Sequence, residues 1–103
     1  MDVERPQVVC LCGSLRFRDL FEAERRRLTA QGVIVLGPEA IDDELTPIRR
    51  EALGELHLRR IDLADEVRVV SVGGYVGTST RREIGYARAR GTAISSVEPI
   101  LGL

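Results

Sequence analysis

Four short apolar runs alternate with three helical segments, and this alternation constrains the fold more than any other feature of the sequence. The apolar runs cover residues 7–12, 33–36, 67–72 and 92–97, and the helical segments cover about 17–31, 47–65 and 80–90. Strands joined by helices through short links form a parallel sheet with helices on both faces. We therefore predict an α/β fold, a flavodoxin-like or Rossmann-like three-layer sandwich with strand order 2-1-3-4. At 103 residues, the chain is predicted to form one domain, 1–103.

Two glycine- and hydroxyl-rich segments follow the first and third predicted strands. Parallel sheets of this order bind ligands outside the carboxyl ends of the strands, at the switch between strands one and three. The two segments are therefore predicted to meet in one crevice, where free backbone N–H groups and the positive end of the third helix favour phosphate. The predicted substrate-binding residues are Gly13, Ser14, Arg16, Tyr75, Gly77, Thr78, Ser79 and Thr80.

Several polar side chains near this crevice have two interpretations each. The guanidinium of Arg16 either binds two phosphate oxygens at once or lies on the surface beside the turn. The ring of Tyr75 either stacks on a base or ribose or packs within its loop. In the acidic segment 37–46, Glu39 and Asp42 either contact ribose hydroxyls or belong to a solvated loop.

Glu83 is the candidate catalytic group, and it also has two interpretations. It is predicted to lie in the first turn of the third helix, where its carboxylate faces whatever the preceding loop binds. Alternatively, Thr80-Arg81-Arg82-Glu83 has the spacing of a capping box, in which Thr80 caps the helix and Glu83 accepts a hydrogen bond from the Thr80 N–H. These four residues alone do not distinguish a catalytic role of Glu83 from a capping role.

Composition and charge exclude several classes of protein. The net charge is −1, so no global basic field favours nucleic acid. No segment reaches the roughly 18 apolar residues of a membrane span, and no apolar signal region begins the chain, which predicts a cytoplasmic protein.

Cys10 and Cys12 share one face of the first strand and are predicted to be buried free thiols. With the one histidine elsewhere they do not make a zinc set, so neither a metal nor a cofactor is predicted.

Three segments resemble the nucleoside 2-deoxyribosyltransferase-like superfamily, which includes base-exchanging transferases and nucleoside 5′-monophosphate N-glycosidases. Cys12-Gly13-Ser14-Leu15-Arg16 is similar to the first-strand turn of the monophosphate glycosidases. The segment 57–65 is similar to the helix before the third strand, and Glu83-Ile84-Gly85-Tyr86-Ala87 is similar to the nucleophile motif. The resemblance implies that Glu83 attacks the sugar C1′ of a nucleoside or nucleoside 5′-monophosphate and forms a covalent glycosyl-enzyme. A carboxylate suits this role because the reacting carbon passes through an oxocarbenium-like state.

The sequence departs from the family pattern at two positions. His57 stands in place of an aspartate, and it is either a catalytic acid or base near neutral pH or a hydrogen-bonded core residue. Gly77 stands where the transferases have an aspartate and the monophosphate glycosidases a small hydroxyl residue, with the hydroxyl residues 78–80 close by. This difference favours a 5′-phosphorylated substrate and hydrolysis over base transfer. In the transferases the chain continues beyond the point that matches Leu103, and this C-terminal segment completes the site of a neighbouring subunit. A pocket without that segment is expected to be enclosed by a second copy, so the resemblance also implies a homodimer.

Two other functions fit the same residues. A nucleotide-sensing module that keeps the pocket and has lost the chemistry is consistent with His57 at the aspartate position. A cytokinin-type phosphoribohydrolase is suggested by Gly73-Gly74-Tyr75-Val76-Gly77-Thr78 followed by Glu83, although Glu83 is spaced too far from Thr78 for that signature. Release of free base from a nucleoside or nucleotide separates the two enzymes from the sensor.

Overall fold

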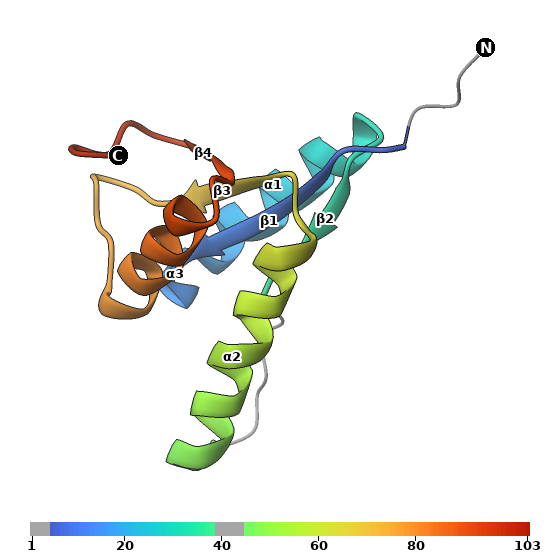
Figure 1. The fold of residues 1–103 in the computed structure, drawn as a ribbon. Coiled ribbons are helices and arrows are strands. Elements are labelled where there is room, and N and C mark those ends of the chain that lie inside the picture. Colours follow the sequence, from blue (N-terminus) through green and yellow to red (C-terminus); the bar gives the residue numbers. More distant parts are fainter. Residues whose placement is uncertain (1–4, 39–44) are drawn as a thin grey trace.

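The computed structural model describes residues 5–38 and 45–103, which form a four-stranded parallel sheet flanked by three α-helices (Figure 1). The elements are β1 (Val8–Gly13), a short 3-10 helix (Leu15–Phe17), α1 (Arg18–Ala30), β2 (Ile34–Leu36), α2 (Pro47–Leu63), β3 (Glu66–Val70), α3 (Thr78–Ala89) and β4 (Ala93–Ser96). The strand order is β2-β1-β3-β4, as predicted from the sequence. Glu39 and Asp42 lie outside the described residues. The described helices include none that combines the length and the mean hydropathy of a membrane span.

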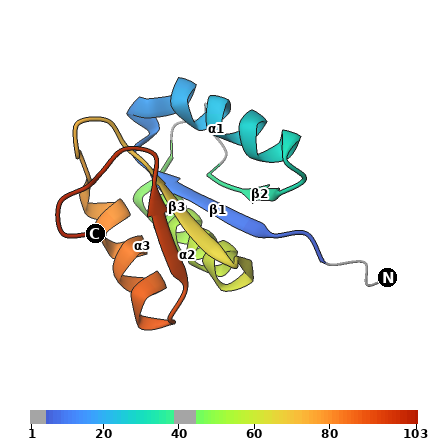
Figure 2. The same cartoon turned by 90° about the horizontal axis from the view of Figure 1, so that it is seen from above.

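Helices cover both faces of the sheet, with α1 on one face and α2 and α3 on the other (Figure 2). The side chains of β1 alternate between these faces. Val9 and Leu11 pack toward α1, whereas Cys10 and Cys12 pack toward α2 and α3. All four side chains are buried, and both cysteines are free thiols, as the sequence predicted. The central strand therefore presents two sulfur atoms to the helices that carry the candidate site.

Helix α2 begins where the sequence predicts and ends slightly earlier. The hydroxyl of Thr46 accepts a hydrogen bond from the Arg49 N–H at 3.2 Å, and Pro47 occupies the first helical position. The helix ends at Leu63, and Asp65 does not close it. The Asp65 carboxylate instead accepts a hydrogen bond from the Val8 N–H at 2.8 Å, so it links the end of α2 to the start of β1.

The predicted start of the third helix at Thr80 is wrong. Helix α3 begins at Thr78 with Gly77 as its N-cap, and no side chain of the described residues caps it. Thr80 lies buried inside the first turn, so it does not form the capping box with Glu83. Glu83 consequently lies in the second turn rather than the first. The cap interpretation of Glu83 is excluded, and its carboxylate is free for other contacts.

A buried carboxylate joins α1 to the opposite edge of the sheet. Glu24 is 7% exposed and accepts hydrogen bonds from Arg27 Nε at 2.9 Å and from Arg68 Nε, on β3, at 2.8 Å. Arg68 also donates to Ser95 Oγ on β4 at 3.1 Å. The hydrogen bond from Arg27, together with the hydrogen bond and charge of Arg68, outweighs burial and holds the pKa of Glu24 below its ordinary value.

We expect the Glu24→Gln variant to lose about 2 kcal/mol of unfolding free energy at pH 7, because two guanidinium groups lose their charged acceptor. Since the pKa of Glu24 is lower in the folded chain, its stabilisation is present above the unfolded pKa and disappears as pH falls through the folded pKa. Urea unfolding of the native chain and the variant at neutral and strongly acidic pH measures the unfolding free energy lost at each pH. Glu22→Gln, on the same helix but exposed, is the control. An equal loss for Glu24→Gln at both pH values would contradict the prediction.

Candidate functional site

The two segments predicted to form the site meet at the carboxyl ends of β1 and β3, which pair directly. A cavity of about 510 Å³ lies there, a volume typical of small-molecule sites. Its walls come from the turn after β1, from α2, and from the loop and helix start that follow β3. Of the residues predicted from the sequence, those that line it are Gly13, Ser14, His57, Tyr75, Gly77, Thr78, Ser79, Thr80 and Glu83.

Arg16 lies behind Tyr75 rather than in the cavity wall. Its guanidinium carbon is 3.8 Å from the centroid of the Tyr75 ring, and its Nη2 donates to the Tyr75 hydroxyl at 3.2 Å. The ring of Phe17 meets the same tyrosine edge to face, with centroids 6.1 Å apart. Tyr75 is therefore held at the cavity by a cation–π contact and an aromatic contact.

The start of α3 suits an anion. Gly73 and Gly74 have φ values of +66° and +77°, a conformation that glycine adopts readily, and they turn the chain back after β3. The Ser71 hydroxyl donates to the Tyr75 carbonyl at 2.6 Å and fixes this turn. The uncapped residues 78–80 then line the cavity at the positive end of the α3 dipole.

Glu83 and His57 approach each other from α3 and α2 at the cavity. Glu83 Oε1 lies 3.7 Å from His57 Nε2, and the two side chains are 15% and 6% exposed. Burial raises the pKa of Glu83, although the charge of His57 opposes the shift. Burial lowers the pKa of His57, but the contact with Cys10 and the charges of Cys10 and Glu83 outweigh it, and the net shift is upward. The pair is thus a buried carboxylate beside an imidazole that favours its protonated form.

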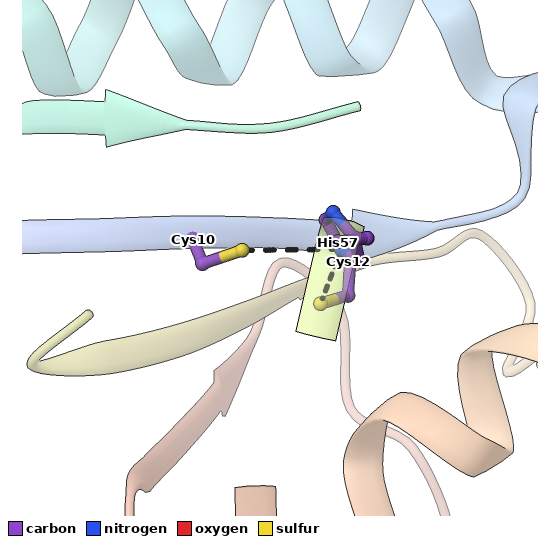
Figure 3. A group of neighbouring side chains, drawn as sticks. All are labelled: Cys10, Cys12 and His57. Carbon is purple, nitrogen blue, oxygen red and sulfur yellow. Dashed lines mark hydrogen bonds between the residues drawn. The ribbon is translucent and has the colours of Figure 1, made fainter. Parts of the chain in front are cut away.

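His57 also lies against both cysteines, although the sequence prediction placed it apart from them. Its Nε2 is 3.2 Å from Cys12 Sγ and 3.9 Å from Cys10 Sγ (Figure 3). The neighbouring Cys12, together with the contact and charge of His57, lowers the pKa of Cys10 to about 6 although burial opposes this, and Cys10 together with burial raises the pKa of Cys12. Within the described residues, Nδ1 of His57 is buried without a hydrogen-bond partner. His57 is therefore both a buried residue and a residue of the cavity wall, so neither sequence interpretation is complete.

Arg50 and Arg60 line the cavity as well, and the sequence prediction missed them. Both project from α2, and each lies three residues from Leu53 or His57, which line the same cavity. Residues three positions apart share one face of a helix, so this spacing is the sequence signal that could have found both arginines. Together with the start of α3, they surround the cavity with positive charge and indicate an anionic ligand.

Comparisons with known proteins agree with this fold. No protein-family model matches the sequence, and no curated protein matches it significantly. Among solved structures, a conserved protein from Enterococcus faecalis V583 superposes with a TM-score of 0.65 at 18% identity, and covers 89% of this chain. A 2-desoxiribosyltransferase from Leishmania mexicana superposes with a TM-score of 0.67 at 16% identity, and covers 88% of it. This chain spans 63% of the length of each solved chain.

The fold is therefore that of a parallel α/β domain with a cavity at the switch between its two central strands. More specifically, it is the fold of a 2-deoxyribosyltransferase, which confirms at the level of the fold the resemblance seen in the sequence.

Proposed function

We propose that this protein cleaves the N-glycosidic bond of a nucleoside 5′-monophosphate or nucleoside, with Glu83 as the nucleophile. The observation that supports this most strongly is the position of the Glu83 carboxylate, largely buried at the cavity and 3.7 Å from His57 Nε2. A second support is the fold, which is shared with an enzyme named as a deoxyribosyltransferase.

The proposed reaction has two steps. A carboxylate oxygen of Glu83 bonds to C1′ while the bond from C1′ to the base nitrogen breaks, and the base leaves with the electron pair and takes up a proton. Water then attacks C1′, gives up a proton, and releases the sugar with Glu83 restored. His57 is the proposed acid and base, because it lines the cavity with its Nε2 3.7 Å from Glu83 Oε1, and histidine is the side chain whose ordinary pKa lies nearest to neutral pH.

A 5′-phosphate is the proposed anchor of the substrate. The uncapped start of α3 and the guanidinium groups of Arg50 and Arg60 border the same cavity as Glu83. These groups bind phosphate oxygens through charge and oriented N–H donors. Hydrolysis is proposed over base transfer because Gly77 occupies the position at which the resembling transferases have an aspartate.

Incubation with a panel of nucleosides and their 5′-monophosphates, followed by chromatography, tests the proposal. We expect free base from at least one monophosphate, faster than from the matching nucleoside, and no exchanged nucleoside when a second base is added. Thermal stabilisation by a nucleotide without release of base across the whole panel would contradict the enzyme and favour the nucleotide sensor.

Arg60→Gln is expected to raise the KM for the monophosphate about tenfold and to leave the KM for the nucleoside nearly unchanged, because one charged hydrogen bond to phosphate is lost. Steady-state kinetics on both substrates measures the difference. Arg49→Gln is the matched control, since Arg49 is an exposed arginine of the same helix. An equal rise in KM for both substrates would show that Arg60 does not bind the phosphate.

Association of two copies and a cytoplasmic location stay predictions from the sequence. We propose the homodimer because a second copy would enclose a cavity that is open to solvent on a domain of this size. Sedimentation of the intact chain measures its mass directly.

A further inference from the structure

Cys10, Cys12 and His57 bring three metal-binding atoms together next to the cavity. The two sulfur atoms come from one face of β1, and Nε2 of His57 reaches them from α2 (Figure 3). All three atoms lie within 4.8 Å of one another. Each residue is at most 5% exposed, so the cluster belongs to the interior of the domain.

The spacing and chemistry of these atoms fit a tetrahedral zinc ion. Zinc bonds of about 2.3 Å to sulfur and about 2.0 Å to nitrogen place neighbouring ligand atoms roughly 3.5 to 3.8 Å apart. The distances from Nε2 to the two sulfurs, 3.2 Å and 3.9 Å, bracket the expected separation. Two thiolates and an imidazole favour zinc over the hard cations calcium and magnesium, which prefer oxygen.

We propose that Cys10, Cys12 and His57 form a zinc site, with its fourth position directed toward Glu83 and the cavity. Glu83 Oε1 is 3.7 Å from the same Nε2, and Glu83 and His57 both line the cavity, so the cluster borders the cavity on its imidazole side while both cysteines are buried. The arrangement has three protein ligands and an accessible fourth position, as in zinc sites that exchange a ligand.

A disulfide between the two cysteines fits their separation less well than a shared zinc ion does. Residues two apart on a strand have Cα atoms separated by about 6.6 Å, since each residue advances the strand by about 3.3 Å. That separation is near the upper limit of about 6.8 Å for a disulfide. A zinc ion bonded to both sulfur atoms does not require the Cα atoms of Cys10 and Cys12 to move closer.

The zinc site and the contact between His57 and Glu83 use the same nitrogen atom. When Nε2 donates its lone pair to zinc, it no longer exchanges a proton with the Glu83 carboxylate. Zinc therefore switches His57 from a partner of Glu83 to a metal ligand. The site itself goes beyond the proposed glycosidic reaction and does not depend on it.

Titration of the reduced, untagged chain with Co²⁺ tests the site. We expect thiolate-to-cobalt absorption and the visible bands of tetrahedral cobalt, saturating at one ion per chain and disappearing when Zn²⁺ is added. The assignment is unambiguous because the chain has two cysteines and one histidine. Absence of these bands with cobalt in molar excess would overturn the proposal, whatever the variants do.

Two variants separate the site from loose binding by thiols and from the enzymatic proposal. His57→Gln should weaken cobalt binding by about tenfold or more, since loss of even an outer contact of a metal ligand has an effect of that size. Unchanged affinity would mean that His57 is not a ligand, and would overturn the proposal. Glu83→Gln should keep the thiolate absorption, so a failure of the glycosidic reaction leaves this result unaffected.

Discussion

Replacement of Glu83 by glutamine is expected to reduce the release of base by a factor on the order of 10³ or more, because the amide does not form the bond to C1′. The folded chain should change little, with a loss of less than about 1 kcal/mol, since glutamine has the same shape and the Glu83 carboxylate makes no capping contact with its own helix. Chromatography measures the release of base, and urea unfolding measures stability. Intact-mass spectrometry should detect a glycosyl adduct on the native chain that the variant lacks.

The matched control for this variant is Glu22→Gln, which makes the same chemical change on the opposite face of the sheet. Glu22 is exposed on α1 and pairs loosely with Arg25 at 3.6 Å, so both rates and stability should stay at the native level. If Glu83→Gln kept its activity, Glu83 would not be the nucleophile. If the native chain and the Glu83→Gln variant bound nucleotides equally well and neither released base, the domain would be a sensor.

The sequence predicted the fold because its determinants are local and periodic. Val9 and Leu11 face α1 while Cys10 and Cys12 face α2 and α3, as the period of a strand requires. Short links between strands and helices favour a parallel sheet with one of a few strand orders, and the observed order is one of these. The same topology brings Ser14 to the cavity that Glu83 borders, although 69 positions separate them along the chain.

The details that the sequence did not predict depend on tertiary packing. Thr80 has the spacing of a helix cap, but the chain already turns helical at Thr78 and buries Thr80. The helical segment predicted over 47–65 places His57 on a helix, whereas its contact with two sulfur atoms depends on how α2 is rotated over β1. Arg16 has the chemistry of a phosphate ligand, yet it lies over Tyr75 instead. Local patterns specify which face a residue occupies and not which partner it meets there.

Gly13→Ala is expected to destabilise the domain by about 3 kcal/mol or more, because no side chain fits where β1 ends. A Cβ atom at this position would lie 2.3 Å from the carbonyl oxygen of Val70, and the φ of +155° is rarely adopted by other residues. Gly13 pairs directly with Val70, so the close approach is part of the β1–β3 ladder that supports the cavity. Thermal unfolding should show a fall in Tm of more than about 12 °C for a domain of this size.

Gly32→Ala provides the comparison that separates backbone strain from the steric clash. Gly32 has a φ of +82° at the end of α1, but a Cβ atom there meets no atom of the described residues within 4 Å. It should therefore cost about 1 kcal/mol, the penalty for a left-handed backbone alone. The excess loss in Gly13→Ala then contains the contact with Val70 together with the additional strain of a φ of +155°. Equal losses in the two variants would mean that the ends of β1 and β3 separate easily, and that Gly13 is required only for its backbone conformation.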